Sequence, residues 1–67
     1  MIKLTTPRGD TVYLAVAAIA EIHEASASSR WHGIRAYVMT VDGRTIGAQE
    51  DVRQIARMVE QEGAGNG

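Results

Sequence analysis

Polar and apolar residues alternate in several short runs along this chain of 67 residues, and such alternation predicts β-strands. Ile2 and Leu4 alternate with polar neighbours, and Val12 and Leu14 do so again after residues 7–10. The intervening segment holds Pro and Gly within four residues, which indicates a turn. The pattern therefore predicts a hairpin with these four apolar side chains on its core side.

The middle of the chain gives weaker signals. Residues 15–20 are rich in alanine but too few for a stable helix, so we expect a short turn there. Residues 20–25 predict a third strand, in which Ile22 is the one large apolar side chain. Residues 26–33 are small and polar around a single tryptophan, which is typical of a loop.

Residues 34–41 form the best strand pattern in the chain, because aromatic and β-branched residues are frequent there. Asp42-Gly43 follows and predicts a type I′ hairpin turn, in which both turn residues have positive φ. The expected cross-strand pairs are Val41 with Arg44, Met39 with Ile46 and Tyr37 with Ala48. Ile34, Ala36 and Val38 then lie on the other face. Both faces are apolar, which predicts either a central strand or a strand covered by a partner.

An amphipathic helix is predicted after the second hairpin. Asp51 and Gln54 have the spacing of a capping box, so Asp51 is the expected N-cap. The apolar stripe that follows contains Val52, Ile55, Ala56 and Val59. Met58 lies beside this stripe and could widen it into a dimer contact. The glycines in residues 63–67 predict the end of the helix and a disordered Gly-rich tail.

These elements predict a small α+β fold. It has an antiparallel β-sheet of about four strands in two hairpins, with one C-terminal amphipathic helix, in a single domain over residues 1–62. A core of this size contributes only about 3–5 kcal/mol, and the chain has no cysteine for a disulfide. We therefore expect a homo-oligomer.

Composition narrows the functional classes. Seven basic and eight acidic side chains give a formal charge of −1, unlike the cationic surface of a non-specific nucleic-acid binder. The chain contains no signal-peptide pattern and no apolar run near the ~20 residues of a membrane span. We expect a soluble cytoplasmic protein with no membrane insertion.

No catalytic, metal or cofactor site is predicted. His23 and His32 are nine residues apart, which is not the spacing of a metal-ligand pair on a helix or hairpin. The serines at 26, 28 and 29 have no defined base beside them, and the glycines match no phosphate-binding loop. A chain this small seldom encloses the pocket that acid–base chemistry needs. An enzyme is the least favoured class.

Arg30, Trp31 and His32, together with Arg35, form the segment most open to a functional interpretation. Trp31 could fold back over the loop to cover a small core. Tryptophan and arginine are also enriched in protein interfaces, and an aromatic ring between basic groups can stack on a nucleobase. The interaction candidates are Trp31, Arg30, Arg35, Tyr37 and Met58. They predict a non-enzymatic protein–protein interaction module, or alternatively a small nucleic-acid-binding regulator that uses Arg30, Trp31 and Arg35.

The order of motifs resembles the small flagellar and swarming-motility proteins of the FlbD type. The resemblance rests on residues 1–5, on Gly9 followed by residues 12–14, on residues 18–22, and on the turn and helix start at residues 42–43 and 51–52. It implies strand, turn, strand and short helix in the same sequence, and a role as an accessory part of a bacterial assembly such as the flagellar motor. The family has no catalytic residues to transfer. The loop at residues 26–33 is longer than the family pattern, and the alternation at residues 38–41 is out of phase with it.

The first residues also resemble the carbon storage regulator family of RNA-binding dimers, which share the opening residues and a Gly-acid pair such as Gly9-Asp10. Those proteins bind RNA through an arginine in a Val-His-Arg-Glu segment before the last helix. This chain has residues 48–51 there, without histidine or arginine. RNA binding of that kind is therefore not expected.

Overall fold

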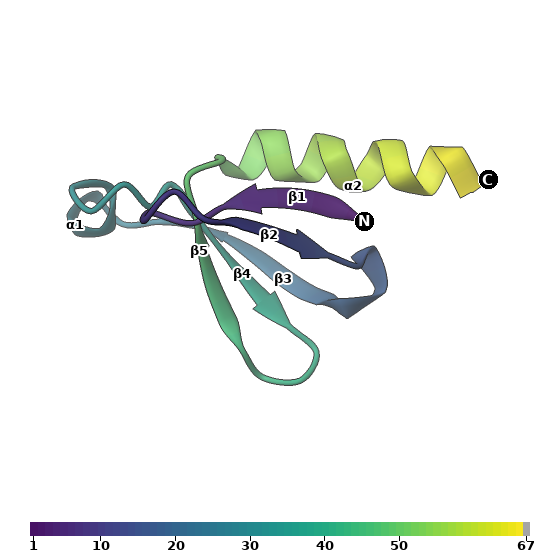
Figure 1. Ribbon diagram of the computed structural model, residues 1–67, viewed down its shortest axis with the longest axis horizontal. Coiled ribbons are helices and arrows are strands. Elements are labelled where there is room, and N and C mark those ends of the chain that lie inside the picture. Colours follow the sequence, from purple (N-terminus) through teal and green to yellow (C-terminus); the bar gives the residue numbers. More distant parts are fainter. Residues whose placement is uncertain (67) are drawn as a thin grey trace.

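The computed structural model describes residues 1–66 and confirms the α+β class. Its strands are β1 (Ile2–Thr5), β2 (Thr11–Leu14), β3 (Ile19–Glu24), β4 (Ala36–Thr40) and β5 (Thr45–Ala48). Its helices are the 3-10 turn η1 (Val16–Ala18), the short α1 (Ala27–Arg30) and the long α2 (Val52–Asn66). The strands number five rather than four, and they form two sheets, β1-β2 and β3-β4-β5, both antiparallel (Figure 1).

The first hairpin is present as predicted. Ile2 pairs with Leu14, and Leu4 pairs with Val12. Ile2, Leu4 and Leu14 are buried and Val12 packs against them, so the predicted core side of the hairpin is confirmed. The short turn expected before the third strand is also present, as η1.

The second hairpin does not contain the predicted type I′ turn. Asp42 has no positive φ, whereas Gly43 has a φ of +91°. The Gly43 N–H donates to the Thr40 carbonyl (3.1 Å), and the Thr40 N–H donates to the Arg44 carbonyl (2.8 Å). These bonds define a three-residue loop, a type I turn followed by a glycine bulge. The Thr40 hydroxyl also donates to the Asp42 carboxylate, which holds Asp42 in this turn.

This longer loop shifts the predicted cross-strand pairs by one residue. Val38 faces Ile46, Ala36 faces Ala48, and Met39 faces Thr45. A shift of one residue exchanges the two faces of a strand. Burial selects the observed register, because Ala36, Val38 and Ala48 are buried together while Tyr37 and Met39 lie on the outer face. The pairing of Met39 with Ile46 and of Tyr37 with Ala48 was therefore wrong.

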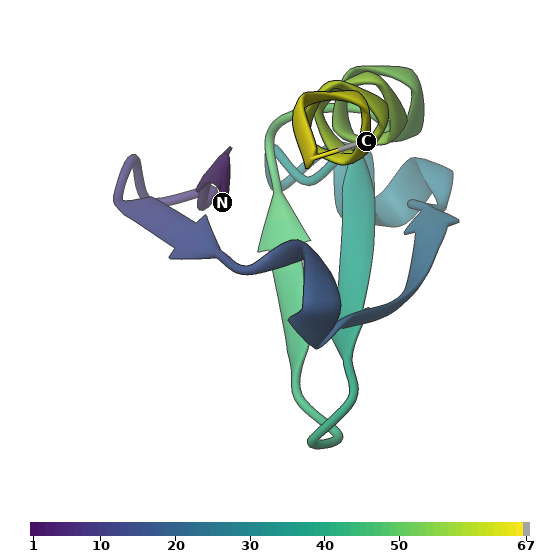
Figure 2. The ribbon, with the colours of Figure 1, turned by 90° about the vertical axis from the view of Figure 1, so that its right-hand side faces the viewer.

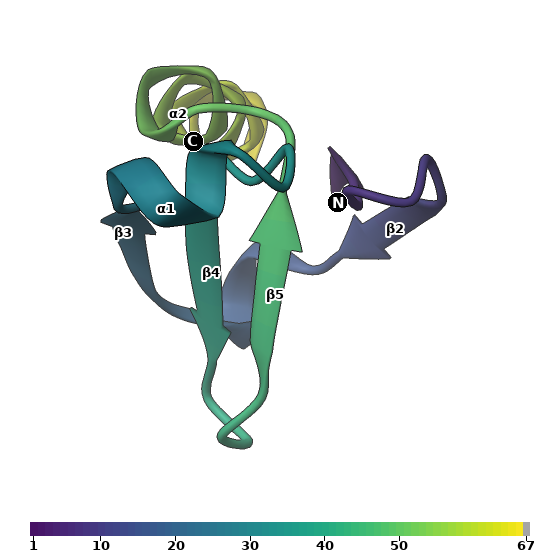
Figure 3. The same cartoon turned by 90° about the vertical axis from the view of Figure 1, so that its left-hand side faces the viewer.

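β4 is the central strand of its sheet, between β3 and β5 (Figure 3). A central strand was one of the two explanations that the sequence offered for its two apolar faces. Seen along the axis of α2, that helix lies above the three-stranded sheet and the β1-β2 hairpin stands to one side (Figure 2). The core fills the space between these three parts. Its largest fully buried side chains are Ile2, Leu4, Val38 and Ile55.

α2 begins as predicted. Asp51 Oδ1 accepts the Gln54 N–H (2.8 Å), and Gln54 Oε1 accepts the Asp51 N–H (3.1 Å), so the capping box is confirmed. Ile55 is buried, and Val52, Met58 and Val59 pack against the core. The expected helix end before Gly63 is wrong, because α2 continues to Asn66. Extending an existing helix requires no new nucleation, which offsets the low helix propensity of glycine. Gly67 lies outside the described residues.

Candidate functional site

Trp31 is exposed at one end of the molecule and does not cover the core. The sequence had left these two positions open. The exposed fraction of Trp31 is 90%. The segment before it is a helical turn, α1, and not the loop that the sequence predicts. The Gly33 N–H donates to the Arg30 carbonyl (3.0 Å) and the Ile34 N–H to the Ser29 carbonyl (3.2 Å). This pair of bonds is a Schellman motif, and the φ of +82° at Gly33 is what it requires.

Three side-chain interactions hold α1 in place. The Ser29 hydroxyl lies 2.7 Å from the Tyr37 hydroxyl on β4. Ser26 Oγ lies 3.3 Å from Ser29 Oγ. The Arg30 guanidinium donates to the Glu24 carboxylate at the end of β3 (2.6 Å). Trp31 therefore projects from a segment that is attached to two strands.

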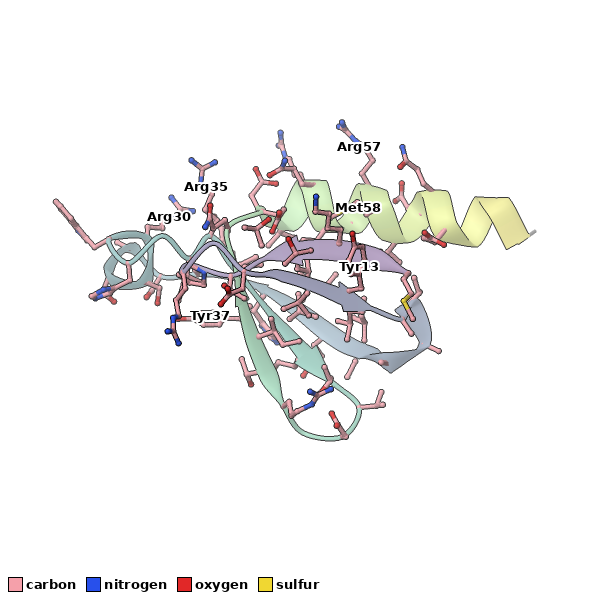
Figure 4. The ribbon with its side chains drawn as sticks, in the orientation of Figure 1. Tyr13, Arg30, Arg35, Tyr37, Arg57 and Met58 are labelled. Carbon is pink, nitrogen blue, oxygen red and sulfur yellow. The ribbon has the colours of Figure 1, made fainter. Side chains whose placement is uncertain are left out.

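A cleft of about 720 Å³ lies beside this segment, between α1, the start of β4 and the start of α2. It is lined by Glu24, Arg30, Arg35, Asp51, Val52 and Arg53. Arg30 and Arg35 lie at the α1 end of the molecule in Figure 4, where the Arg35 side chain points outward. The cleft thus brings together three guanidinium groups and two carboxylates from four separate stretches of the chain.

The charges in the cleft are not all paired. Glu24 forms its ion pair with Arg30, and Asp51 accepts the Gln54 N–H as the helix cap. Within residues 1–66, neither the Arg35 nor the Arg53 side chain forms an ion pair or a hydrogen bond. The Arg35 backbone is fixed, because its N–H donates to the Ala48 carbonyl (2.8 Å) and its carbonyl accepts the Ala25 N–H (3.1 Å). The cleft therefore presents two free cationic side chains from a rigid frame.

The other two interaction candidates lie elsewhere. Tyr37 is on the outer face of β4, where with His23, Met39 and Thr45 it lines a shallow, mainly apolar groove of about 360 Å³. Met58 lies in the middle of α2 and packs against the core, one residue from the outward-pointing Arg57 (Figure 4). The structure thus brings Arg30 and Arg35 together in one cleft and separates them from Met58, while Trp31 adjoins only Arg30.

Sequence reasoning did not place four residues of the cleft in a functional site, namely Glu24, Asp51, Val52 and Arg53. Asp51 was predicted as the N-cap and Val52 as part of the apolar stripe of the helix, and neither Glu24 nor Arg53 was among the candidates. The two helix predictions are correct locally, since Asp51 is the cap and Val52 packs against the core. No local signal could have placed Arg53 beside Arg35, because 18 residues separate them and their proximity depends on how α2 packs.

Among residues 1–66, two carboxyl groups, those of Asp42 and Glu50, have shifted pKa values, and both lie outside the cleft. The hydrogen bond from the Thr40 hydroxyl lowers the pKa of Asp42 in the second turn. At Glu50, burial raises the pKa, but the hydrogen bonds from Thr5 outweigh it and the pKa falls below its usual value. Both shifts thus belong to groups that hold the fold together.

On β3, His23 Nε2 lies 3.6 Å from Glu21 Oε1, and both side chains are more than half exposed. Across residues 1–66, no group of three or more potential metal ligands lies close enough to hold an ion.

Neither α1 nor α2, as far as the chain is described, has the length and apolar character needed to cross a bilayer.

Comparison of the chain with protein-family models, with curated proteins and with solved structures gave no significant match. The interpretation of the cleft and of Trp31 therefore rests on their geometry.

Proposed function

We propose that this chain is a non-enzymatic protein–protein interaction module whose contact surface is centred on Trp31. The observation that carries the proposal is the 90% exposure of the one tryptophan in the chain. Large aromatic side chains and arginine are enriched among the residues that contribute most to binding at interfaces. Trp31 follows Arg30 in the chain, and Arg30 lines the same cleft as Arg35, so both kinds of anchor belong to one segment of the molecule.

The attachment of α1 supports the same function. A side chain that is already held in position loses less conformational freedom when a partner binds. The bonds from Ser29 to Tyr37 and from Arg30 to Glu24 provide such a frame. A tryptophan that is 90% exposed contributes little to the core, so Trp31 is free to contact another molecule without loss of packing.

The setting that follows from the FlbD-type resemblance is a bacterial assembly such as the flagellar motor, in which the chain would be a cytoplasmic accessory component. Self-association is part of this proposal. The groove beside Tyr37 and Met39 is on the sheet face opposite the core, and a domain this small gains stability by covering such a face with a second copy. Sedimentation velocity at micromolar concentration checks this part, and a strict monomer would remove it.

The proposal is tested by affinity capture of the tagged chain from cells that express it, with identification of the retained proteins. Trp31→Ala is expected to lose a specific partner without lowering the thermal stability of the chain. Tyr13→Ala is the matched control, because Tyr13 is another exposed aromatic residue, on β2, with an exposed fraction of 66%. Equal retention by the native chain and Trp31→Ala would contradict the proposal.

Nucleic-acid binding is the second candidate, and the exposed Trp31 directly after Arg30, which shares a cleft with Arg35, favours it. An exposed indole with neighbouring guanidinium groups can stack on a base and contact a phosphate. The ion pair between Arg30 and Glu24 and the formal charge of −1 weigh against it. Salt-dependent binding of a single-stranded oligonucleotide that Trp31→Ala abolishes would favour this function over the first.

A further inference from the structure

We infer that the cleft between α1 and α2 binds a carboxylate group of an acidic peptide segment, and that Arg35 and Arg53 are its ligands. This inference rests on the proposed interaction function and specifies the chemistry of the partner. The two guanidinium groups line one cleft of about 720 Å³ and have no anionic partner within residues 1–66. Guanidinium groups bind carboxylates through two parallel charge-assisted hydrogen bonds, which add geometric specificity as well as energy.

The remaining charges of the cleft are already engaged. Arg30 forms an ion pair with Glu24, with 2.6 Å between Nη2 and Oε1. Asp51 Oδ1 accepts the Gln54 N–H at 2.8 Å. An incoming carboxylate therefore meets the two free guanidinium groups, while Val52 adds an apolar patch to the wall. Because Arg35 is fixed by backbone bonds to Ala25 and Ala48, binding requires the ordering of two side chains and no movement of the backbone.

The composition of the cleft favours a peptide over a nucleic acid. A nucleic acid presents an unbroken row of phosphates and needs an extended cationic surface. Here the carboxylates of Glu24 and Asp51 line the same cleft as the arginines, so the cationic surface is not continuous. The cleft volume of about 720 Å³ falls within the range of pockets that bind small ligands. Arg30 connects the cleft to Trp31, so an acidic segment with a neighbouring apolar residue could contact both.

The test uses the full chain and a fluorescein-labelled hexaglutamate peptide, with binding measured by fluorescence anisotropy at low salt. Hexaglutamine, a short oligothymidylate and inorganic phosphate are the comparison probes. Arg35→Gln and Arg53→Gln are each expected to raise the dissociation constant by about tenfold, the scale of one lost charge-assisted hydrogen-bonded pair. Arg57→Gln is the matched control, because Arg57 is exposed on the same helix one turn from Arg53 and does not line the cleft.

The NMR signals of the arginine side-chain Nε–H groups locate the site independently. Saturable shifts at Arg35 and Arg53, with none at Arg57, are the expected result on addition of hexaglutamate. Equal weakening by Arg57→Gln, no saturable binding, or tighter binding of oligothymidylate or phosphate than of hexaglutamate would overturn the inference.

Trp31→Ala separates this inference from the proposed function. Hexaglutamate has no apolar side chain for the indole, so its affinity is expected to be unchanged within about twofold in Trp31→Ala. If the native chain retains a partner through Trp31 but binds no hexaglutamate, the cleft inference fails and the interaction function stands. If hexaglutamate binds at Arg35 and Arg53 but Trp31→Ala retains every partner, the cleft inference stands and the Trp31 surface fails.

Discussion

Thr5 and Glu50 are joined by two hydrogen bonds although 45 residues separate them in the chain. The Thr5 N–H donates to Glu50 Oε1 and the Thr5 hydroxyl donates to Oε2, both at 2.8 Å. Beside them, the Gln49 N–H donates to the Thr5 carbonyl at 2.7 Å. These bonds connect the end of β1 to the segment between β5 and α2, and so join the first hairpin to the rest of the molecule.

This connection predicts a pH-dependent stability. The pKa of Glu50 is raised by burial and lowered more strongly by its bonds from Thr5, so in the folded chain it lies below its usual 4.5. A lowered pKa stabilises the fold above pH 4.5, and this contribution is lost as the pH falls through the folded-state pKa. Glu50→Gln is expected to lower the free energy of unfolding by about 1–2 kcal/mol at neutral pH.

Urea denaturation of the native chain and of Glu50→Gln, at neutral pH and at about pH 3, checks this prediction. The difference between the two should narrow in acid. Glu60→Gln is the control, because Glu60 is exposed on α2, and it should leave stability unchanged at both pH values. A difference between native and Glu50→Gln that does not change with pH would contradict the assignment.

Replacement of glycine by alanine is expected to change the stability of the chain in opposite directions at Gly43, in the second turn, and at Gly63, in α2. Gly43 has a φ of +91° and Gly63 has no positive φ, while a Cβ at either site would meet no atom within 4 Å. Gly43→Ala is expected to destabilise the chain by about 1–2 kcal/mol through backbone strain alone. Gly63→Ala, in the helix, is expected to stabilise it by up to about 1 kcal/mol. Thermal unfolding of the two variants measures both effects, and a shift in the same direction would show that the turn is not as described.

Gly47 in β5 packs against Ile34, which lies two residues before β4. A Cβ at Gly47 would lie 3.1 Å from Ile34 Cδ1, so Ile34 covers the strand where Gly47 has no side chain. Gly47→Ala is expected to be destabilising by about 1 kcal/mol, and addition of Ile34→Val, which removes Cδ1, is expected to restore part of that loss. A double-mutant cycle measures the coupling. Strictly additive effects would indicate that the two residues do not touch.

The buried face of α2 contributes Ile55 to the hydrophobic core. Ile55 is 0% exposed and contacts a core drawn from both sheets, whereas Val41 in the second turn is 68% exposed. Ile55→Val is expected to lower the free energy of unfolding by about 0.5–1.5 kcal/mol. Val41→Ala is expected to change it by less than about 0.5 kcal/mol. Chemical denaturation distinguishes them, and equal effects would place Ile55 outside the core.

The sequence predicted the features that depend on near neighbours. The first hairpin, the capping box of Asp51 and Gln54 and the buried Ile55 each follow from residues within one turn or one strand of each other. The second hairpin was predicted in position but not in register, because Asp42-Gly43 is compatible with two loop lengths. The three-residue loop is the one that puts Val38 and Ile46 on the same, core-facing side of the sheet. Which side faces the core depends on the elements that pack against the sheet.

By itself, the sequence determined the order of the elements and the side of the hairpin and of the helix that is buried, since hydrophobic periodicity records both. It also contained the glycine that ends the segment of Trp31, although Gly33 was not recognised as a helix terminator. Only the tertiary structure placed Arg35 beside Arg53 and left both without an anionic partner within residues 1–66. The reason is physical: a cleft is made by residues from separate elements, and its charges are set by the packing of α2 across the sheet, which no local pattern encodes.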